Sequence, residues 1–290
     1  MTASFAHHHF VRMNGAGNEI LILDLRGSAL DMTPDFARAI GRGEGLHFDQ
    51  MMVLNTPRWP AADAYVTIYN IDGSLAAACG NGTRCVAWWL MRGTTRTHLK
   101  LETGAGILEC TRTGEQTFTV DMGEPRLGWA DIPLSLATDD TTAVDLQIEA
   151  GMARGLPLAS CVSMGNPHAV FFVDDAAAWD IAAIGPLLER HPMFPQKANI
   201  SFASVLAPAH ILLHVWERGA GITRACGSAA CATLVAAVRA GLTDRHARIS
   251  LPGGDLTIEW RADNHVLMSG PVEFEREGRL DPALFAAVPA

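Results

Sequence analysis

Ala78-Cys79-Gly80-Asn81-Gly82 and Ala225-Cys226-Gly227-Ser228-Ala229 are two stretches of this 290-residue sequence that resemble each other. Each stands between a polar loop that contains glycine and a run with the composition of a helix, so each is expected to place a thiol at a helix N-terminus. The two cysteines lie 147 positions apart (79 to 226). One such site would carry little information, but two predict a duplicated unit with two reactive sulfurs.

The similarity of the two halves extends beyond the cysteines. Leu90-Met91-Arg92-Gly93 follows the first predicted helix, and Val238-Arg239-Ala240-Gly241 follows the second. Met122-Gly123-Glu124-Pro125 resembles Met268-Ser269-Gly270-Pro271. A repeat with this long period predicts two α+β domains related by a pseudo-twofold axis. Because domain interfaces are preferred ligand sites, we expect the active site in a cleft between the halves, with the two thiols facing each other.

The length fits two domains of ordinary size, and 49% hydrophobic residues supply their cores. We expect the first domain to span residues 1–124 and the second residues 125–270, with residues 271–290 packing on the first. A Pro- and Asp-rich passage, residues 124–142, is interpreted as the join. Helices are expected over residues 33–41, 80–91, 178–189 and 227–240.

Charge and hydropathy exclude several classes of protein. The net charge is −9, from 22 basic and 31 acidic residues. This charge does not indicate binding to nucleic acid, and it disfavours binding to an anionic membrane surface. No apolar run approaches the ~18 residues of a transmembrane helix. Residues 1–10 lack the pattern of a signal peptide. Six scattered cysteines are too few for a disulfide scaffold, so we expect a cytoplasmic protein with reduced thiols.

The two stretches suggest a particular kind of chemistry. A helix N-terminus carries unpaired N–H groups and a partial positive charge, which lower the pKa of a nearby thiol and bind carboxylates. Gly80 and Gly227 allow close approach to the backbone. Two such helix ends around one carboxylate suit removal of the α-proton from one face and delivery to the other, with the sulfurs as general base and general acid. We expect this chemistry to need neither a metal nor pyridoxal phosphate.

Other interpretations of the cysteines remain open at this point. Cysteines in apolar elements are usually small buried hydrophobes. We assign this role to the other four cysteines: Cys85, Cys110, Cys161 and Cys231. A zinc-binding or thiol-sensing module would use Cys79-x5-Cys85 and Cys226-x4-Cys231, although these spacings are loose for a structural zinc site. A nucleophilic thiol enzyme would pair one cysteine with His168, which leaves the second without a role.

Seven stretches together resemble the diaminopimelate epimerases, and they span most of the chain, about residues 10 to 280. They are Gly15-Ala16-Gly17-Asn18, Phe48-Asp49-Gln50, Asn70-Ile71-Asp72-Gly73-Ser74, Cys79-Gly80-Asn81-Gly82-Thr83-Arg84-Cys85, Val162-Ser163-Met164-Gly165-Asn166-Pro167-His168, Glu217-Arg218-Gly219-Ala220-Gly221 and Ala225-Cys226-Gly227-Ser228. The resemblance implies that each domain is a mostly antiparallel sheet or barrel wrapped on a central helix. It also implies cofactor-independent interconversion of LL- and meso-2,6-diaminopimelate in lysine and peptidoglycan precursor biosynthesis.

The resemblance implies a role for each matching residue. Cys79 and Cys226 would be the two acid/base thiols, and His168 and Glu217 would adjust their protonation. The substrate-binding residues would be Asn18, Gln50, Asn70, Gly80, Asn81, Asn166, Asn199, Glu217, Arg218, Gly227 and Ser228. No metal ligand is implied. The partners would be the small-molecule substrate and a second copy of the chain in a homodimer, with no nucleic acid and no membrane.

These residue types suit the substrate physically. Diaminopimelate has two amino-acid ends and only one is epimerised, so the other must be held by neutral donors and acceptors plus one fixed cation. Residues outside the duplicated stretches, such as Asn70, Asn199 and Arg218, are expected to select the substrate. Gly80-Asn81 and Gly227-Ser228 are expected to hold the carboxylate of the reacting end.

The sequence also departs from the family pattern. Ile222 stands where many members have Glu, Ala229 replaces a usual glycine, and Glu19-Ile20 replaces a frequent Asp-Phe. An aromatic residue linked to dimer contacts is replaced around Arg276. The alternative within enzymes is a two-thiol racemase of the same fold, for proline or hydroxyproline. Those enzymes typically have histidine where Asn81 stands.

Overall fold

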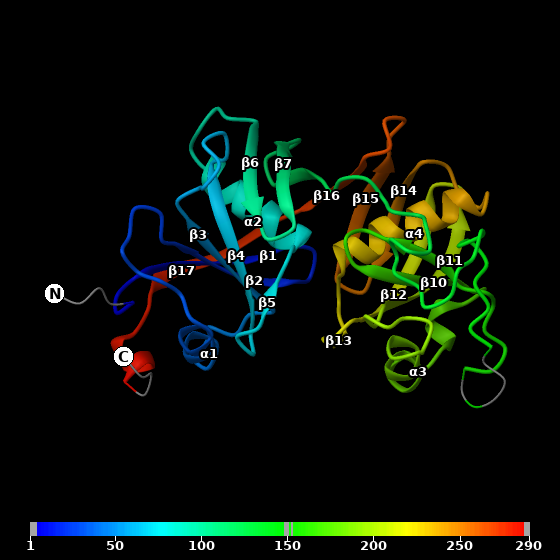
Figure 1. Cartoon of the computed structure of the whole chain (residues 1–290). Helices are drawn as coiled ribbons and strands as arrows, with labels where there is room; N and C mark the ends of the chain where they lie inside the picture. Colours follow the sequence, from blue (N-terminus) through cyan, green and yellow to red (C-terminus); the bar gives the residue numbers. More distant parts are fainter. Residues whose placement is uncertain (1–4, 148–150, 152, 287–290) are drawn as a thin grey trace. The chain divides into compact units, whose positions relative to one another are not determined.

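The computed structural model describes residues 5–147, 151 and 153–286, and within them the chain forms two compact units (Figure 1). Unit 1 consists of the described residues of Met1–Val120 and Gly270–Ala290, and unit 2 of those of Asp121–Ser269. Strands outweigh helices in both units.

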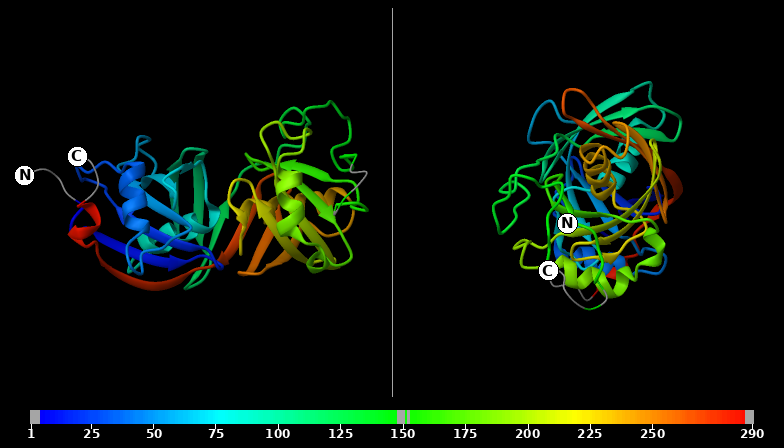
Figure 2. Two further views of the ribbon diagram at one scale, coloured as in Figure 1. Left: turned by 90° about the horizontal axis from the view of Figure 1, so that it is seen from below. Right: turned by 90° about the vertical axis from the view of Figure 1, so that its right-hand side faces the viewer.

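Unit 1 is built on a mixed, mostly antiparallel sheet. Its strands are β1 (His9–Asn14), β2 (Glu19–Asp24), β3 (Gln50–Asn55), β4 (Ala64–Asn70), β5 (Leu75–Ala76), β6 (His98–Thr103), β7 (Gly106–Arg112), β8 (Thr117–Asp121) and β17 (Glu273–Arg279). They pair in the order β17–β1–β2–β3–β4–β6–β7–β8, with β5 also on β4. Only β2–β3 and β4–β6 are parallel among these pairs. Figure 2 shows β1 (blue) and β17 (red) side by side.

Two helices pack on this sheet. α1 (Pro34–Gly41) begins where Thr33 accepts a hydrogen bond from the N–H of Phe36, and the proline occupies the first helical turn. α2 (Gly80–Met91) contacts β2, β3 and β7, and all its residues from Gly80 to Ala87 are buried. A Cβ on Gly82 would lie 2.5 Å from Sδ of Met52 on β3, so this glycine sets how closely α2 approaches the sheet.

Unit 2 repeats the arrangement. Its strands are β9 (Ser160–Ser163), β10 (Pro167–Phe172), β11 (Asn199–Ala207), β12 (His210–Glu217), β13 (Gly221–Ile222), β14 (His246–Leu251), β15 (Gly254–Trp260) and β16 (Val266–Pro271). They pair in the order β9–β10–β11–β12–β14–β15–β16, with β13 also on β12. Here β10–β11 and β12–β14 are the parallel pairs.

The central helix of unit 2 is α4 (Gly227–Arg239). It contacts β9, β10, β11, β14 and β15, and Figure 1 shows it beside the labelled strands β10, β11 and β14. All its residues from Ala229 to Ala237 are buried. α3 (Ile181–Glu189) lies against β11, β12 and β13, and it follows a 3₁₀ turn at Ala176–Ala178. Small alanine side chains allow close contact between α4 and the strands around it.

The two units match element by element. The elements β1, β2, α1, β3, β4, β5, α2, β6, β7 and β8 correspond in order to β9, β10, α3, β11, β12, β13, α4, β14, β15 and β16. The parallel and antiparallel pairs fall at the same places, and β17 is the one additional described strand in unit 1. The prediction of a mostly-sheet α+β chain in two repeated halves, each with a central helix, is therefore confirmed.

The sequence patterns did not reveal every element. The strands β1, β5, β11, β13 and β17 were not predicted, and the helix expected over residues 178–189 begins at Ile181 after the 3₁₀ turn. β17 lacks the alternation of apolar and polar residues that predicts a strand, because it is rich in charged residues. It pairs with β1 at the edge of the sheet described above. The passage 124–142 packs within unit 2. Arg126 forms an isolated antiparallel β-bridge with Ser163, and the N–H of Cys161 donates to Thr141 O at 2.7 Å.

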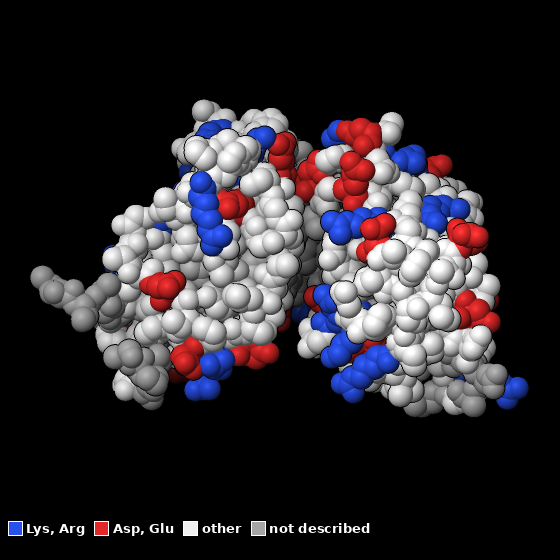
Figure 3. All heavy atoms as spheres, viewed as in Figure 1, with Lys and Arg blue, Asp and Glu red and all other residues white. Residues whose placement is uncertain are grey.

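The surface carries both signs of charge. On the face shown in Figure 3, Lys and Arg side chains are intermingled with Asp and Glu. Among the described residues, no helix combines the length and the apolar character needed to cross a membrane.

Candidate functional site

Cys79 is the N-cap residue of α2. Its Sγ accepts a hydrogen bond from the N–H of Gly82 at 3.3 Å. Its carbonyl accepts from both the N–H and the hydroxyl of Thr83, each at 2.8 Å. The thiol is therefore held at the positive end of a buried helix, as the sequence predicted.

The turn between β1 and β2 brings Asn18 to this thiol. The N–H of Gly15 donates to Asn18 O at 2.9 Å, and Ala16 and Gly17 both have positive φ, 59° and 88°. A Cβ on Gly15 would lie 3.0 Å from Asn81 O, so the turn lies directly against the start of α2. As a result, Oδ1 of Asn18 accepts from the Cys79 thiol with a sulfur–oxygen distance of 3.7 Å.

Gln50 and Asn70 complete the group around Cys79. Gln50 begins β3, Asn70 ends β4, and the two are register partners. Oε1 of Gln50 accepts from the Cys79 thiol at 3.6 Å, while its Nε2 donates to Asn70 Oδ1 at 3.4 Å. The structure thus brings together four of the predicted residues of unit 1 and places Asn81 in the first turn of α2.

Cys226 is the N-cap residue of α4 and is only 5% exposed. Its Sγ lies 3.5 Å from Oγ of Ser228. Burial raises the pKa of this thiol well above its usual value, and the negative charge of Glu217 raises it further, while bonds from Ser228 and the N–H of Ala229 oppose the shift. The expectation of a lowered thiol pKa is therefore wrong for Cys226, because desolvation outweighs the helix N-terminus.

His168 reaches Cys226 only through other side chains. Asn166 Nδ2 donates to Ser228 Oγ at 3.3 Å, and Asn166 Oδ1 lies 2.9 Å from Nε2 of His168. Because an amide oxygen only accepts, Nε2 carries the proton. Burial, with a smaller effect of the Arg218 charge, lowers the pKa of His168 to about 3. A histidine with so low a pKa is a weak proton acceptor, which argues against its being the dedicated base of a nucleophilic cysteine.

Asn199 and Arg218 lie at adjoining strand ends. The side chain of Asn199 donates to Pro167 O at 3.0 Å and accepts from the N–H of Arg218 at 2.8 Å. The guanidinium of Arg218 donates to Gln196 O at 3.1 Å, and the residue is exposed. The amide of Asn199 is thus engaged by the backbone, whereas part of the Arg218 side chain faces solvent.

The repeat extends to most of these polar residues. Asn18 and Asn166 occupy the equivalent turns before β2 and β10. Gln50 and Asn199 begin β3 and β11, and Asn70 and Glu217 end β4 and β12. The strand pattern repeats at the positions of Asn70 and Asn199, but the residue types there differ between the two units.

Three residues near Cys79 were given no role from the sequence. Asp49 accepts from Asn18 Nδ2 at 2.9 Å, and Ser74 accepts from Asn70 Nδ2 at 3.0 Å. Ser74 in turn donates to Asp72 at 2.6 Å. All three lie in stretches that carry the family resemblance, which was the available signal.

The six cysteines all lie in the described part of the chain, and none forms a disulfide. Burial raises the pKa of Cys85, Cys110 and Cys161 to about 12 in each case, which fits their predicted role as buried hydrophobes. Over residues 5–147, 151 and 153–286, no group of three or more His, Cys, Asp or Glu side chains is placed to hold a metal ion.

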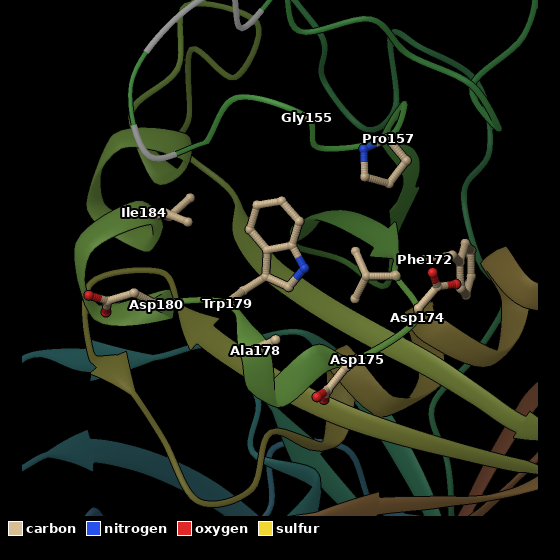
Figure 4. A pocket seen from close by; sticks show the side chains of 10 residues that line it. Gly155, Pro157, Phe172, Asp174, Asp175, Ala178, Trp179, Asp180 and Ile184 are labelled. Atoms are coloured by element: carbon tan, nitrogen blue, oxygen red, sulfur yellow. The ribbon is translucent and has the colours of Figure 1, made fainter.

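A separate pocket of about 760 Å³ lies in unit 2 beside Trp179 (Figure 4). Pro157 contributes an apolar wall, and the carboxylates Asp174, Asp175 and Asp180 also line it. Asp175 and Asp180 each cap a following helical turn. None of the predicted site residues is among those that line this pocket.

The fold is shared with solved structures that include a racemase and an epimerase. A probable proline racemase from Agrobacterium radiobacter K84 aligns with a TM-score of 0.68 at 14% identity, covering 97% of this chain and 94% of that one. A hydroxyproline epimerase from Agrobacterium vitis also gives 0.68, at 15% identity, covering 96% and 93%. Structures this distant in sequence show the shared fold.

Sequence comparison defines the family. A family model described as diaminopimelate epimerase matches residues 10–128 and 160–275. The diaminopimelate epimerase of Methylocella silvestris is 58% identical over 277 residues, covering 95% of this chain and 96% of the relative. That of Rhodopseudomonas palustris strain TIE-1 is 54% identical over 279 residues, covering 96% and 94%. The chain belongs to the diaminopimelate epimerase family.

Proposed function

We propose that this protein interconverts LL- and meso-2,6-diaminopimelate by a two-thiol acid/base mechanism, in lysine and peptidoglycan precursor biosynthesis. One observation carries the proposal: in a chain of this family, a cysteine caps the central helix at the equivalent position of each repeated half. Inversion of one carbon by proton transfer at opposite faces uses two groups, each of which acts as the base in one direction and as the acid in the other, and two thiols can fill both roles.

In the forward direction, one of the sulfurs of Cys79 and Cys226 removes the α-proton from the reacting carbon. The other delivers a proton to the opposite face of that carbon. The thiolate that takes the α-proton ends as a thiol, and the thiol that delivers a proton ends as a thiolate. Proton exchange with water then returns both sulfurs to their starting states. The two thiols titrate as a coupled pair in this cycle.

The helix ends supply electrostatic stabilisation. As the α-proton leaves, negative charge moves onto the α-carboxylate oxygens. We assign the first turns at Gly80-Asn81 and Gly227-Ser228 to bind this carboxylate, because N–H groups at a helix start have no partner within the helix. Such preorganised donors stabilise the additional negative charge that builds up on the carboxylate during the reaction.

The distal amino-acid end of the substrate needs a different set of contacts. We assign it to Asn70, Asn166, Asn199 and Arg218, and we assign Asn18 and Gln50, which contact the Cys79 sulfur, to substrate binding beside that thiol. The amides offer both donors and acceptors, and the exposed Arg218 side chain offers a fixed positive charge for the distal carboxylate.

Glu217 and His168 are proposed to tune Cys226. Glu217 favours the protonated thiol through its negative charge. Neutral His168 orients Asn166, whose amide then contacts Ser228 beside the sulfur. These two residues would thereby bias Cys226 toward the proton-donating form before substrate binds.

We further propose that the enzyme acts in the cytoplasm as a homodimer, with diaminopimelate as its small-molecule partner. Domain boundaries near residues 124 and 270 belong to the same proposal, with residues 271–290 assigned to the first domain.

The activity is tested by incubating the purified protein with LL-diaminopimelate in deuterated water. Chiral chromatography should show the meso isomer, and mass spectrometry should show solvent deuterium at the α-carbon of that product. L-Proline and trans-4-hydroxy-L-proline, offered in parallel, should remain unchanged. Deuterium exchange into proline, with none into diaminopimelate, would instead identify the racemase alternative.

A further inference from the structure

Two chains of hydrogen bonds lead away from the Cys79 sulfur and each ends on a carboxylate. In the first, the thiol donates to Asn18 Oδ1 at 3.7 Å, and Asn18 Nδ2 donates to Asp49 Oδ2 at 2.9 Å. The same Asp49 oxygen accepts from the N–H of Glu19 at 2.8 Å. The backbone N–H of Asp49 donates to Glu19 O at 2.9 Å. Asp49 is therefore tied to the Asn18 turn at two points.

The second chain is longer. The thiol donates to Gln50 Oε1 at 3.6 Å, and Gln50 Nε2 donates to Asn70 Oδ1 at 3.4 Å. Asn70 Nδ2 donates to Ser74 Oγ at 3.0 Å, and the Ser74 hydroxyl donates to Asp72 Oδ1 at 2.6 Å. The N–H of Ser74 also donates to this oxygen at 2.8 Å.

The carboxylates give both chains a direction. A primary amide has one accepting and one donating end, and it can turn over to exchange them. An ionised carboxylate only accepts, so the amide next to it must present its NH₂ group there. The hydroxyl of Ser74 transmits the same requirement, since it donates to Asp72 and must accept from Asn70. Each chain thus turns an amide oxygen toward the sulfur of Cys79.

Asp49 and Asp72 are the anchoring carboxylates of the two hydrogen-bond chains, and the equivalent positions of unit 2 carry no carboxylate. The residue before Asn199, which corresponds to Asp49, is the buried Ala198. The residue two places after Glu217, which corresponds to Asp72, is Gly219. In unit 2 the acceptor beside the sulfur is instead the carboxylate of Glu217 itself. The two halves keep the capping cysteine and differ in how its proton is held.

We infer that Asp49 and Asp72 are positioning residues of the reaction proposed above, which fix the amides of Asn18, Gln50 and Asn70 so that carbonyl oxygens face Cys79. The inference rests on the proposed function for its catalytic meaning, but the orientation is a property of unit 1. Two oxygens directed at the sulfur stabilise the thiol and disfavour the thiolate. Loss of an anchor frees an amide to turn its NH₂ group toward the sulfur, which stabilises the thiolate.

The test measures alkylation of Cys79 by iodoacetamide against pH, with peptide mass spectrometry to read each cysteine separately. In Asp49→Ala, the pH at half-maximal alkylation of Cys79 should fall by about one unit. At a pH below this midpoint, Cys79 should then react about tenfold faster than in wild type. Asp49→Asn loses the same charge but keeps an acceptor oxygen, so its profile should stay close to wild type. Asp31→Ala, an exposed carboxylate outside both chains, is the matched control.

Ser74→Ala tests the second chain independently, including the case in which Asp49→Ala does not fold. It removes the hydroxyl between Asn70 and Asp72, so the Cys79 midpoint should again fall, while Ser74→Thr should restore it. Unchanged Cys79 profiles in folded Asp49→Ala and Ser74→Ala would overturn the inference. Equal shifts at Cys79 and Cys226 would also overturn it, because they would indicate general loosening. Alkylation requires no turnover, so a protein inactive on diaminopimelate would refute the proposed function without affecting this result.

Discussion

At the residue scale, the two thiols have equivalent backbone positions and different surroundings. Cys79 faces the amide oxygens of Asn18 and Gln50. Cys226 is buried beside Glu217, which corresponds to Asn70 in the repeat. Asn70 places a neutral amide at one strand end, and Glu217 places a carboxylate at the equivalent end in the other unit. The two thiols therefore have different electrostatic surroundings. This difference is compatible with the proposed reaction, because its substrate and product are different stereoisomers.

Neutralising Glu217 should make Cys226 more reactive. The charge of Glu217 raises the pKa of the thiol, so Glu217→Gln should lower this pKa and speed alkylation of Cys226 at pH 7 several-fold. The exposed Glu259→Gln in the same unit is the matched control. An unchanged or slower alkylation of Cys226 in Glu217→Gln would show that the charge does not act on this sulfur.

The low pKa of His168 in the folded protein should lower the free energy of unfolding in mild acid. Its pKa is about 3 in the folded protein, whereas an unfolded histidine titrates near 6.5. The unfolded state therefore takes up the proton first, and the free energy of unfolding should fall by about 1.4 kcal/mol per pH unit below about 6.5. His168→Gln removes this contribution, so its stability relative to wild type should improve by about 2 kcal/mol between pH 6.5 and pH 5.

Denaturant unfolding of both proteins at several pH values measures this difference. The exposed His98→Gln should show no such relative gain. A constant difference between wild type and His168→Gln across this range would mean that the buried imidazole does not control the acid response.

At the element scale, close packing of helices on strands sets the geometry of each site. On α3, a Cβ at Gly185 would lie 2.5 Å from ring atoms of Trp216, the residue before Glu217. The indole is rigid and its Nε1 donates to Glu189 at 2.8 Å, so it has little freedom to move. The position of Glu217 therefore depends on a glycine in a helix outside the site.

Gly185→Ala should destabilise the protein by about 1–3 kcal/mol through overpacking. Gly104→Ala is the control, because its Cβ would meet only ordinary contacts at 3.6 Å. Chemical denaturation gives both values. Trp216→Leu should lower the free energy of unfolding less in the Gly185→Ala background than in wild type. If the double variant loses the sum of the two single losses, the two residues do not compete for space.

Much of the element pattern was accessible from sequence, for physical reasons. α2 begins at Gly80 and α4 at Gly227 as predicted, because capping cysteines, glycines and apolar runs all favour the same boundaries. The polar β17 was missed because it is rich in charged residues and its pairing partner β1 lies near the other end of the chain. β11 was also missed, although it pairs with the adjacent β12. The burial that raises the pKa of Cys226 was also missed, since it depends on packing around the whole of α4.

At the scale of the whole molecule, the repeated fold places a cysteine at the equivalent N-cap position of each unit, and these two cysteines are the proton-transfer groups that we propose. The matched order of strands and helices explains why Asn18, Gln50 and Asn70 correspond to Asn166, Asn199 and Glu217. The sequence signal for this was limited, since the local stretch around Asn199 carries no motif. Only strand register places it opposite His168 and beside β12.

The two-thiol mechanism requires no metal, and this also can be tested on the intact protein. Purified protein should carry well below one zinc per chain by elemental analysis, and dialysis against EDTA should leave epimerisation unchanged. A stoichiometric zinc ion bound through the cysteines would support the metal-binding alternative and contradict the mechanism.

The most direct test of the central claim compares Cys79→Ser and Cys226→Ser with wild type on LL-diaminopimelate in deuterated water. Wild type should form the meso isomer with one solvent deuterium at the inverted carbon. Each single variant should lose epimerisation by at least about 10²-fold, because general acid–base groups of this kind contribute roughly 10²–10⁴-fold. Full epimerisation by either variant would contradict the claim that both sulfurs act on one carbon.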